Sequence, residues 1–482
     1  MKANNAYFCQ NFLSMDRYRE QMQDEDEFKQ VLERFEDMVE RKSSYFFDIE
    51  EFESIIDYYL DIRNFKKANE AIEIAEKQHP GASELIIKHI QIFLETNQPA
   101  QAIDLIKEIP EWDLESADIY LLRGTALAQL GKILEAEKQF DIALTKTEED
   151  KVEILINISM AFENARKFNI AIKYLRIAFS IEPNNLTVLY DLGFYYERLH
   201  EYATSIEFYN KYLDEDPFSD NVWYNLGVVY YKINQPIKAL ESYDYAIAVN
   251  PSYASAYFNK ANIYANDSDF VNAIAVYHDF LSLEEDHIQG WCYLGECYDQ
   301  IEAFDLALKT YKRVIEIDNT YAEGWFGAGL AYLSKSNTTD AISYLLKAIE
   351  LDSENSDYWF HLGESYETSD AIPEAIKCYK HTVTLDPKDD QAWLNLAGIY
   401  YKQKDYITAL EIIADSLKVN AEDAEILVLE AACRFRLADW ISGFISLKKA
   451  LVLDEKIGDD FFKIFPEGLR NKRIQLLFNK PL

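Results

Sequence analysis

One 34-residue stretch of the chain, residues 220–253, reads DNVWYNLGVVYYKINQPIKALESYDYAIAVNPSY. Its large aromatic residue returns every 34 residues further along, with tyrosine taking the place of tryptophan once. The series is Trp223, Tyr257, Trp291, Trp325, Trp359 and Trp393. After each tryptophan come two residues, Leu or Ala, Gly or Ala, two more residues and Tyr. This period predicts a stack of helix–turn–helix units, which offers a long surface instead of a catalytic cleft.

Small and large residues alternate inside residues 220–253 in a way that predicts how the two helices pack. Gly227 and Ala239 are small, which allows the two helices to cross closely. Larger side chains fill the space beside this crossing, namely Trp223, Leu226, Tyr230 and Tyr243. Pro251 cannot continue a helix, so we expect the second helix to end before it.

This pattern resembles the tetratricopeptide repeat (TPR), and the resemblance covers residues 49–457. Steps of 34 residues, with one residue inserted near Lys146–Lys151, predict repeat starts at Ile49, Ser83, Ala117, Val152, Leu186, Asp220, Ala254, Ile288, Ala322, Ser356, Asp390 and Ala424. The second repeat is degenerate because Pro110 shortens its second helix. The resemblance implies an all-α, right-handed superhelical solenoid of about 12 repeats.

Both ends of the chain depart from the repeat pattern, as the ends of a stacked array must. Residues 1–48 contain a predicted helix from Glu27 to Arg41, with apolar residues at helical spacing. We interpret residues 1–48 as an N-terminal cap, and a partner-binding helix is the alternative. Residues 458–482 are predicted to form a C-terminal capping helix.

The charge of the chain excludes some classes of partner. It has 84 Asp and Glu against 48 Lys and Arg, a net charge of −36, which disfavours nucleic acid and favours basic protein segments. Alternatively, the acids only keep a tyrosine-rich solenoid in solution. The five cysteines form no CxxC pair, and no apolar run is long enough to span a membrane, so we expect a cytoplasmic protein.

The resemblance also implies which side chains line the concave face, because TPR arrays direct positions 2, 5, 6, 9, 12 and 13 of each repeat into it. Position 5 is aromatic in most central repeats, and position 6 is often asparagine, which can bind a peptide backbone. An average TPR carries the same residues for packing, which is the alternative explanation. The predicted partner-binding groove comprises Tyr190, Phe194, Tyr224, Asn225, Phe258, Asn259, Glu296, Asp299, Phe326, Leu330, Leu333, Phe360, Glu364 and Glu367.

Three consecutive repeats depart from the average pattern in this groove. Their concave positions are acidic, then apolar, then acidic: Glu296 and Asp299, Phe326 with Leu330 and Leu333, and finally Glu364 and Glu367. Carboxylates facing one concavity attract cations. We therefore expect a partner segment with an apolar centre and flanking Lys or Arg, and a solvated groove without special purpose is the alternative.

Two familiar kinds of activity find no support in the residues. TPR co-chaperones bind the C-terminal carboxylate of heat-shock chaperones with Lys at position 5 and with Lys or Arg in a later repeat. Here no repeat has Lys at position 5, and none has Lys or Arg at position 2. Catalytic and metal-binding motifs such as HExxH, GxGxxG and GxSxG are missing, so we expect no catalytic residues, no cofactor and no metal.

The sequence thus predicts a non-catalytic adaptor or scaffold that binds a protein or peptide. It is similar to the acidic TPR-only proteins of bacteria. A structural subunit of a larger assembly or a homo-oligomer, contacting through edges and termini, is the alternative.

Overall fold

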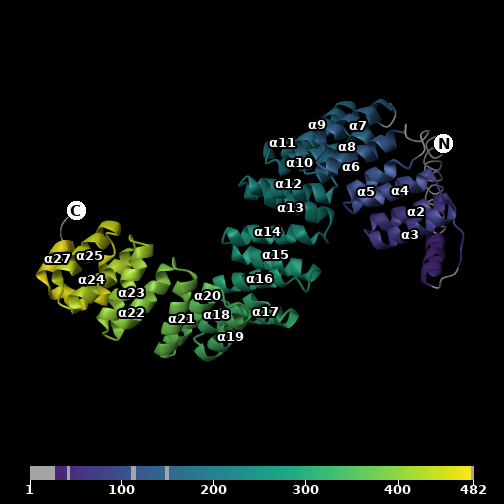
Figure 1. The fold of residues 1–482 in the computed structure, drawn as a ribbon. Coiled ribbons are helices and arrows are strands. Elements are labelled where there is room, and N and C mark those ends of the chain that lie inside the picture. The colour runs from purple at the N-terminus through teal and green to yellow at the C-terminus, as the bar shows by residue number, and fades with distance from the viewer. Residues whose placement is uncertain (1–27, 41–43, 110–115, 147–150, 479–482) are drawn as a thin grey trace, which may run out of the picture. The chain divides into compact units, whose positions relative to one another are not determined.

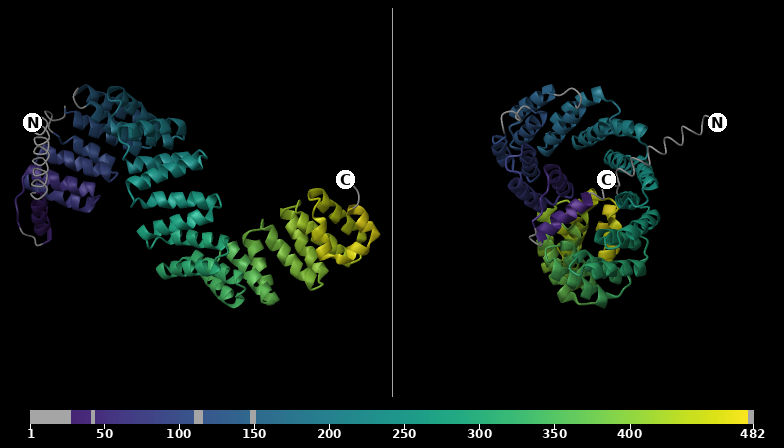
Figure 2. Two further views of the ribbon diagram at one scale, coloured as in Figure 1. Left: turned by 180° about the vertical axis from the view of Figure 1, so that it is seen from behind. Right: turned by 90° about the vertical axis from the view of Figure 1, so that its right-hand side faces the viewer.

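The computed structural model describes residues 28–40, 44–109, 116–146 and 151–478, and the regular structure in these residues is entirely helical. The chain divides into two compact units, Met1–Ser242 and Tyr243–Leu482, and the division falls inside helix α13. In each unit, consecutive helices lie side by side (Figure 1), and the same stacking appears from two other directions in Figure 2.

The first unit contains a helix over residues 28–40, followed by helix pairs that each form one repeat. The helices are α2 (Ile49–Asp61), α3 (Phe65–Gln78), α4 (Ser83–Glu95), α5 (Pro99–Ile106), α6 (Ala117–Gln129), α7 (Ile133–Lys146), α8 (Lys151–Asn164), α9 (Phe168–Ile181), α10 (Leu186–Arg198), α11 (Tyr202–Glu215), α12 (Asp220–Lys232) and the first part of α13 (Pro236–Val249).

The second unit continues the helix pairs and ends with three short helical segments. The helices are α14 (Ala254–Asn266), α15 (Phe270–Leu283), α16 (Ile288–Gln300), α17 (Phe304–Ile317), α18 (Ala322–Ser334), α19 (Thr338–Leu351), α20 (Ser356–Thr368), α21 (Ile372–Leu385), α22 (Asp390–Lys402), α23 (Tyr406–Val419), α24 (Ala424–Arg436), α25 (Trp440–Leu453), α26 (Gly458–Ile464), the 3₁₀ helix η1 (Pro466–Arg470) and α27 (Lys472–Phe478).

The helix boundaries confirm the predicted repeat series. Each first helix begins at the expected residue, except that α8 begins one residue early, at Lys151. Helix α5 is short, with eight residues, and ends at Ile106, as the degenerate second repeat predicted. Pro110 and the proposed insertion near residues 147–150 lie outside the described residues. The all-α architecture of about 12 helix-pair repeats is therefore confirmed.

A left-handed residue follows the first helix at position 15 in all twelve described repeats. The residues with positive φ are Arg63, Asn97, Gly131, Arg166, His200, Asn234, Ser268, Glu302, Ser336, Asp370, Lys404 and Ala438. This conformation ends a helix and reverses the chain. Only one of the twelve is glycine, so most of the turns carry the steric cost of a side chain in that region.

The recurring tryptophans secure each first helix to the turn before it. Their indole N–H groups donate to the backbone carbonyl six residues earlier: Trp291 to Glu285 at 2.8 Å, and Trp325 to Asn319 at 3.0 Å. The bonds of Trp223, Trp359 and Trp393 have the same spacing. The most regular feature of the sequence therefore has a structural role.

The core inside a repeat forms where a small residue of the first helix faces an aromatic residue of the second. At Gly363, an added Cβ would lie 2.8 Å from the ring of Tyr379, which is fully buried. Within each unit, second helices also pack on the first helix of the next repeat, as α17 packs on α18 and α19 on α20. Burial therefore continues from repeat to repeat within each unit.

The described ends of the chain pack on the outermost repeats. Phe35, on the helix of residues 28–40, is 1% exposed and lies 6.1 Å from Phe47 and 6.2 Å from Tyr59 between ring centroids. At the other end, the buried Phe461 lies 6.1 Å from Phe435. The capping roles of residues 1–48 and 458–482 stay predictions, and residues 1–27 and 479–482 lie outside the described part.

Candidate functional site

The predicted groove residues fall in both units. Tyr190, Phe194, Tyr224 and Asn225 lie on α10 and α12 of the first unit, and the other ten lie on α14, α16, α18 and α20 of the second. All of them are on first helices, as expected. Because the two units are separate bodies, each set of residues is described by itself.

The aromatic side chains at position 5 are half-buried and take part in packing. Phe258 lies 5.0 Å from Phe280 between ring centroids, and Phe360 lies 5.8 Å from Tyr379. In the first unit, Tyr190 and Phe194 are parallel at 6.5 Å. Part of each ring therefore stabilises the repeats, which is what the packing explanation of this pattern required.

The asparagines at position 6 have hydrogen-bond acceptors inside the protein. The amide of Asn225 donates to the Tyr190 hydroxyl at 3.2 Å, and that of Asn259 donates to the Tyr243 hydroxyl at 3.5 Å. Asn395 makes the same contact with Tyr379 at 3.4 Å. These contacts give the amide N–H groups a structural use, and binding of a peptide backbone by the same amides stays a prediction.

A pocket of about 320 Å³ opens on the first helices α16, α18 and α20 of the second unit. It brings together four predicted groove residues, Glu296, Asp299, Phe326 and Leu330. Its remaining lining consists of Cys292, Gln300, Tyr311, Glu323, Gly327, Asn355, Asp357 and Tyr358. The predicted residues Leu333, Phe360, Glu364 and Glu367 do not line it.

The two carboxylates from α16 carry the unusual electrostatics of this pocket. The Tyr311 hydroxyl donates to Oδ2 of Asp299 at 2.9 Å, while Oδ1 of Asp299 is buried without a hydrogen-bond partner. Burial raises the pKa of Asp299 to about 6. The side chain of Glu296 reaches solvent, yet its pKa is also raised, by the protein that surrounds it and by Asp299. The pocket therefore disfavours the charged forms of both carboxylates, and a bound cation would stabilise them.

The two acidic residues predicted for the far side of the groove already have partners. Glu364 accepts a hydrogen bond from Nδ1 of His361 at 2.7 Å, if that nitrogen carries the proton. Glu367 pairs with Lys402 at 2.7 Å and accepts the Tyr379 hydroxyl at 3.3 Å. The acidic–apolar–acidic pattern is therefore uneven, and its unpaired charge lies on the side of α16.

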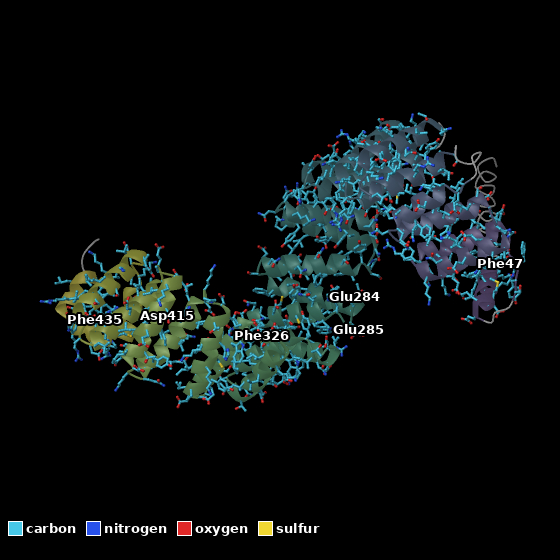
Figure 3. All side chains as sticks on the ribbon, viewed as in Figure 1. Phe47, Glu284, Glu285, Phe326, Asp415 and Phe435 are labelled. Atoms are coloured by element: carbon cyan, nitrogen blue, oxygen red, sulfur yellow. The ribbon has the colours of Figure 1, made fainter. Side chains whose placement is uncertain are left out.

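A glycine in the lining of the pocket packs against a buried tyrosine. Gly327 occupies position 6 of its repeat, where four other repeats carry asparagine, and a Cβ there would overlap the ring of Tyr311. The neighbouring Phe326 lies 4.7 Å from Tyr358 and 5.6 Å from His361 between ring centroids. Figure 3 labels Phe326 on α18. A half-buried aromatic ring thus borders an acidic hollow.

Sequence reasoning missed several residues of this pocket. Glu323 and Asp357 occupy position 2 of their repeats, so the rule that identified the concave face could have included them. Tyr311 lies on the second helix α17, and Tyr358 is at position 3. Neither position belongs to the concave set, so no sequence signal pointed to these two tyrosines.

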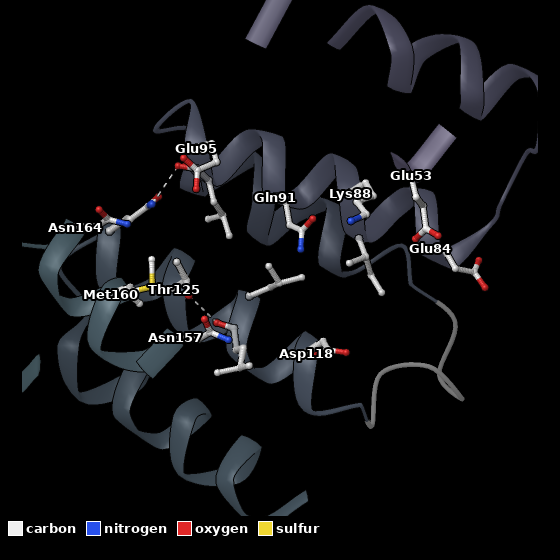
Figure 4. Close-up of a pocket in the computed structure, with 16 residues that line it drawn as sticks. Glu53, Glu84, Lys88, Gln91, Glu95, Asp118, Thr125, Asn157, Met160 and Asn164 are labelled. Atoms are coloured by element: carbon white, nitrogen blue, oxygen red, sulfur yellow. Dashed lines mark hydrogen bonds between the residues drawn. The ribbon is translucent and has the colours of Figure 1, made fainter. Parts of the chain in front are cut away.

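The first unit holds a second hollow of about 470 Å³, lined by residues of α2, α4, α6 and α8. Its wall is apolar at Ile87, Leu94 and Leu121, and Figure 4 shows acidic and amide side chains around it, including Glu53 and Gln91. These residues also occupy concave positions. The sequence pattern did not point to them, because the first repeats depart most from the average repeat.

Other kinds of site are not seen in the described residues. No group of three or more His, Cys, Asp or Glu in that part of the chain is arranged to hold a metal ion. None of its helices is both long enough and apolar enough to cross a membrane. The four described cysteines are buried and unpaired, and burial raises the pKa of the Cys292 thiol to about 12.

Comparison with known families agrees with the repeat series. Four models described as tetratricopeptide repeat match residues 157–220, 221–253, 288–321, 326–390 and 378–411. The chain is a tetratricopeptide repeat protein. TPR arrays are protein-interaction scaffolds and typically have no catalytic function of their own. No curated protein sequence matches this TPR protein.

Several solved structures are similar to this TPR protein. YrrB, described as a TPR protein with an unusual peptide-binding site, is 21% identical over 38% of this chain and 94% of its own, with a TM-score of 0.34. The Cut9–Hcn1 structure is 14% identical over 80% of this chain and 89% of its own, with a TM-score of 0.38. A TPR protein from Parabacteroides merdae is 17% identical over 52% of this chain and 98% of its own, with a TM-score of 0.35.

All three TM-scores are below 0.5, so the assignment rests on the repeat matches and on the helix pairs of the chain itself. The similarity to acidic TPR-only proteins of bacteria stays a prediction.

Proposed function

We propose that this TPR protein is a non-catalytic adaptor that binds a segment of a partner protein on the concave positions of α16, α18 and α20. The segment has an apolar centre and carries Lys or Arg. The observation that supports this proposal is the pocket that joins Glu296 and Asp299 to Phe326 and Leu330. The two carboxylates attract the Lys or Arg of the partner segment, and the apolar residues next to it in the segment then contact Phe326 and Leu330.

The charge distribution favours this occupant over an acidic one. Glu296, Asp299, Glu323 and Asp357 line the pocket, and no Lys or Arg does. None of these four carboxylates forms an ion pair within the described residues. The absence of cofactor, metal and nucleic acid and the cytoplasmic location belong to the same proposal as predictions.

The test is affinity capture from the native lysate with two four-site variants. The groove variant reverses Glu296, Asp299, Glu364 and Glu367 to Lys. The control variant reverses Asp279, Glu284, Glu285 and Glu411, which are exposed acids of the same unit outside the pocket. We expect a partner that the wild type and the control capture and the groove variant loses. A partner retained by the groove variant, or lost equally by both variants, would overturn the proposal.

A second candidate function, a subunit of a larger assembly, is favoured by the apolar surface of α25. Ile441 is 78% exposed, Ile445 54% and Val452 65%, and they follow one another at helical spacing. An exposed apolar stripe of this kind is typical of an interface. Molar mass measured at low and high salt tests it: a monomer at all concentrations in both conditions would exclude self-association.

A further inference from the structure

The pocket between α16, α18 and α20 contains two buried polar groups without partners, and they come from different helices. Oδ1 of Asp299, on α16, is shielded from solvent and accepts no hydrogen bond. Tyr358, on α20, is 1% exposed, and its hydroxyl makes no hydrogen bond, although the Asn355 side chain is close enough to offset part of the increase in its pKa. Leaving such groups unsatisfied destabilises a fold, so a ligand that satisfies both would bind favourably.

Two of the four pocket carboxylates lie where the helix dipole does not stabilise negative charge. Glu323 and Asp357 lie in the first turns of α18 and α20, where the helix dipole stabilises negative charge. Glu296 and Asp299 lie in the second half of α16, which ends at Gln300, where the same dipole disfavours them. A cation bound in the pocket would offset this unfavourable interaction, which is strongest for Asp299 in the last turn of α16.

The shape of the pocket suits a flat cation. Phe326 is only half-buried, so part of its ring is open to the pocket. Aromatic faces attract cations, and a guanidinium can also stack on them. The carboxylates of α16 and the hydroxyl of Tyr358 then supply acceptors around the rim of such a group.

We propose that this pocket binds the guanidinium group of an arginine in the partner segment, in preference to the ammonium group of a lysine. The guanidinium presents five N–H donors in a rigid plane, so it can donate to Asp299, Glu296 and Tyr358 together. An ammonium presents three donors from one nitrogen and is more strongly hydrated. The arginine proposal rests on the proposed function. It specifies the cationic group of the partner that the carboxylates of α16 bind.

The probes are three peptides, acetyl-Gly-Leu-Xaa-Leu-Gly-amide, in which Xaa is arginine, lysine or citrulline. Citrulline has nearly the shape of arginine without its charge. Affinities are measured by ligand-observed NMR with the full chain at pH 7.5 and low salt. Each charge-assisted hydrogen bond contributes enough to change affinity by about tenfold. We therefore expect the arginine peptide to bind about tenfold more tightly than the lysine peptide, and the citrulline peptide to bind at least as weakly as lysine.

Three single variants locate this preference. Asp299→Asn and Glu296→Gln should each lower the affinity for the arginine peptide about tenfold. Tyr358→Phe removes only the unpaired hydroxyl, so it should reduce the ratio of arginine to lysine affinity and leave the thermal midpoint unchanged or higher. Glu284→Gln with Glu285→Gln removes two exposed charges from the turn before α16 (Figure 3) and should change neither affinity.

Equal binding of the arginine and lysine peptides would overturn the proposal, as would an arginine preference that survives Asp299→Asn. An equal loss of affinity in the Glu284 and Glu285 control would show a general charge effect and would also overturn it. Failure of the arginine proposal is distinguishable from failure of the proposed function. If charge reversal in the groove abolishes partner capture while the peptides show no preference, the groove proposal stands and the arginine proposal falls.

Discussion

The Tyr311 hydroxyl donates a hydrogen bond of 2.9 Å to Oδ2 of Asp299 and leaves Oδ1 of the same carboxylate buried without a partner. Tyr311 is itself 4% exposed and lies under Gly327. Tyr311 is therefore part of the core, whereas the negative charge of Asp299 is only partly stabilised by its neighbours. This half-satisfied carboxylate leads to a prediction about stability at different pH values.

Replacing Asp299 with Asn should stabilise the protein at neutral pH. The pKa of Asp299 is raised to about 6 by burial, whereas an unfolded Asp has a pKa of about 4. Between these values the folded chain holds more protons than the unfolded chain, so this group lowers the free energy of unfolding as the pH rises from 4 to 6. The neutral Asn still accepts the Tyr311 hydrogen bond and removes this loss, which we estimate at about 1–2 kcal/mol.

Denaturant unfolding of wild type and Asp299→Asn at pH 4.5, 6 and 7.5 measures this effect. The difference between the two proteins should grow with pH and level off above pH 7. Glu285→Gln, on an exposed turn, serves as the control and should follow the wild type. A constant difference at all three pH values would show that Asp299 keeps an ordinary pKa in the folded protein.

Two helical glycines should respond to alanine in opposite ways. At Gly327, on α18, a Cβ would overlap the buried Tyr311 ring, so Gly327→Ala should cost about 1–3 kcal/mol. At Gly398, on α22, a Cβ would meet nothing within 4 Å, so Gly398→Ala should stabilise by about 0.5–1 kcal/mol. Both values come from denaturant unfolding of the full chain. Stabilisation by both variants would mean that Tyr311 is free to move away from Gly327.

The fold could be read from the sequence because the period repeats one physical solution many times. The spacing of the tryptophans, the small residues at the helix crossing and Pro251 all repeat a local constraint, and the helix starts followed from them. The left-handed turn at position 15 could not be read in the same way. Residues as different as Arg63, Asp370 and Ala438 occupy it, so the composition carries no signal.

The candidate site was only partly predictable, for a different reason. The concave positions of α16 and α18 identified Glu296, Asp299, Phe326 and Leu330, which do share one pocket. Whether a charge is free depends on contacts across repeats, however. The ion pair of Glu367 with Lys402 joins residues 35 positions apart, and no local pattern reports it.

The left-handed turns offer a test with a matched pair of substitutions. Ala438 adopts a φ of 61° and Gly131 a φ of 74° at equivalent positions. A side chain in this region costs about 1 kcal/mol relative to glycine. Ala438→Gly should therefore stabilise the protein by up to about 1 kcal/mol, and Gly131→Ala should destabilise it by a similar amount.

Thermal and denaturant unfolding of these two variants give the comparison directly. Asn97, with a φ of 57°, supplies the control, because asparagine tolerates this region better than alanine. Asn97→Gly should change stability less than Ala438→Gly does. Destabilisation by Ala438→Gly would indicate that the methyl group contributes more by packing than its conformation costs.

The proposed C-terminal cap leads to the last prediction, which concerns local opening. Phe461 on α26 is fully buried against Phe435 of α24, and Arg436 donates to both oxygens of Glu467, at 3.0 and 2.9 Å. Losing a buried phenylalanine side chain costs about 3–5 kcal/mol. Because contacts in a repeat array are local, Phe461→Ala should open the last repeat without unfolding the rest.

Hydrogen exchange should therefore accelerate in α24 and α25 and stay unchanged in α16. Leu476→Ala, at a position that is 58% exposed on α27, is the control and should leave α24 and α25 protected. Unchanged protection of α24 and α25 in Phe461→Ala would show that residues 458–482 do not cap the array.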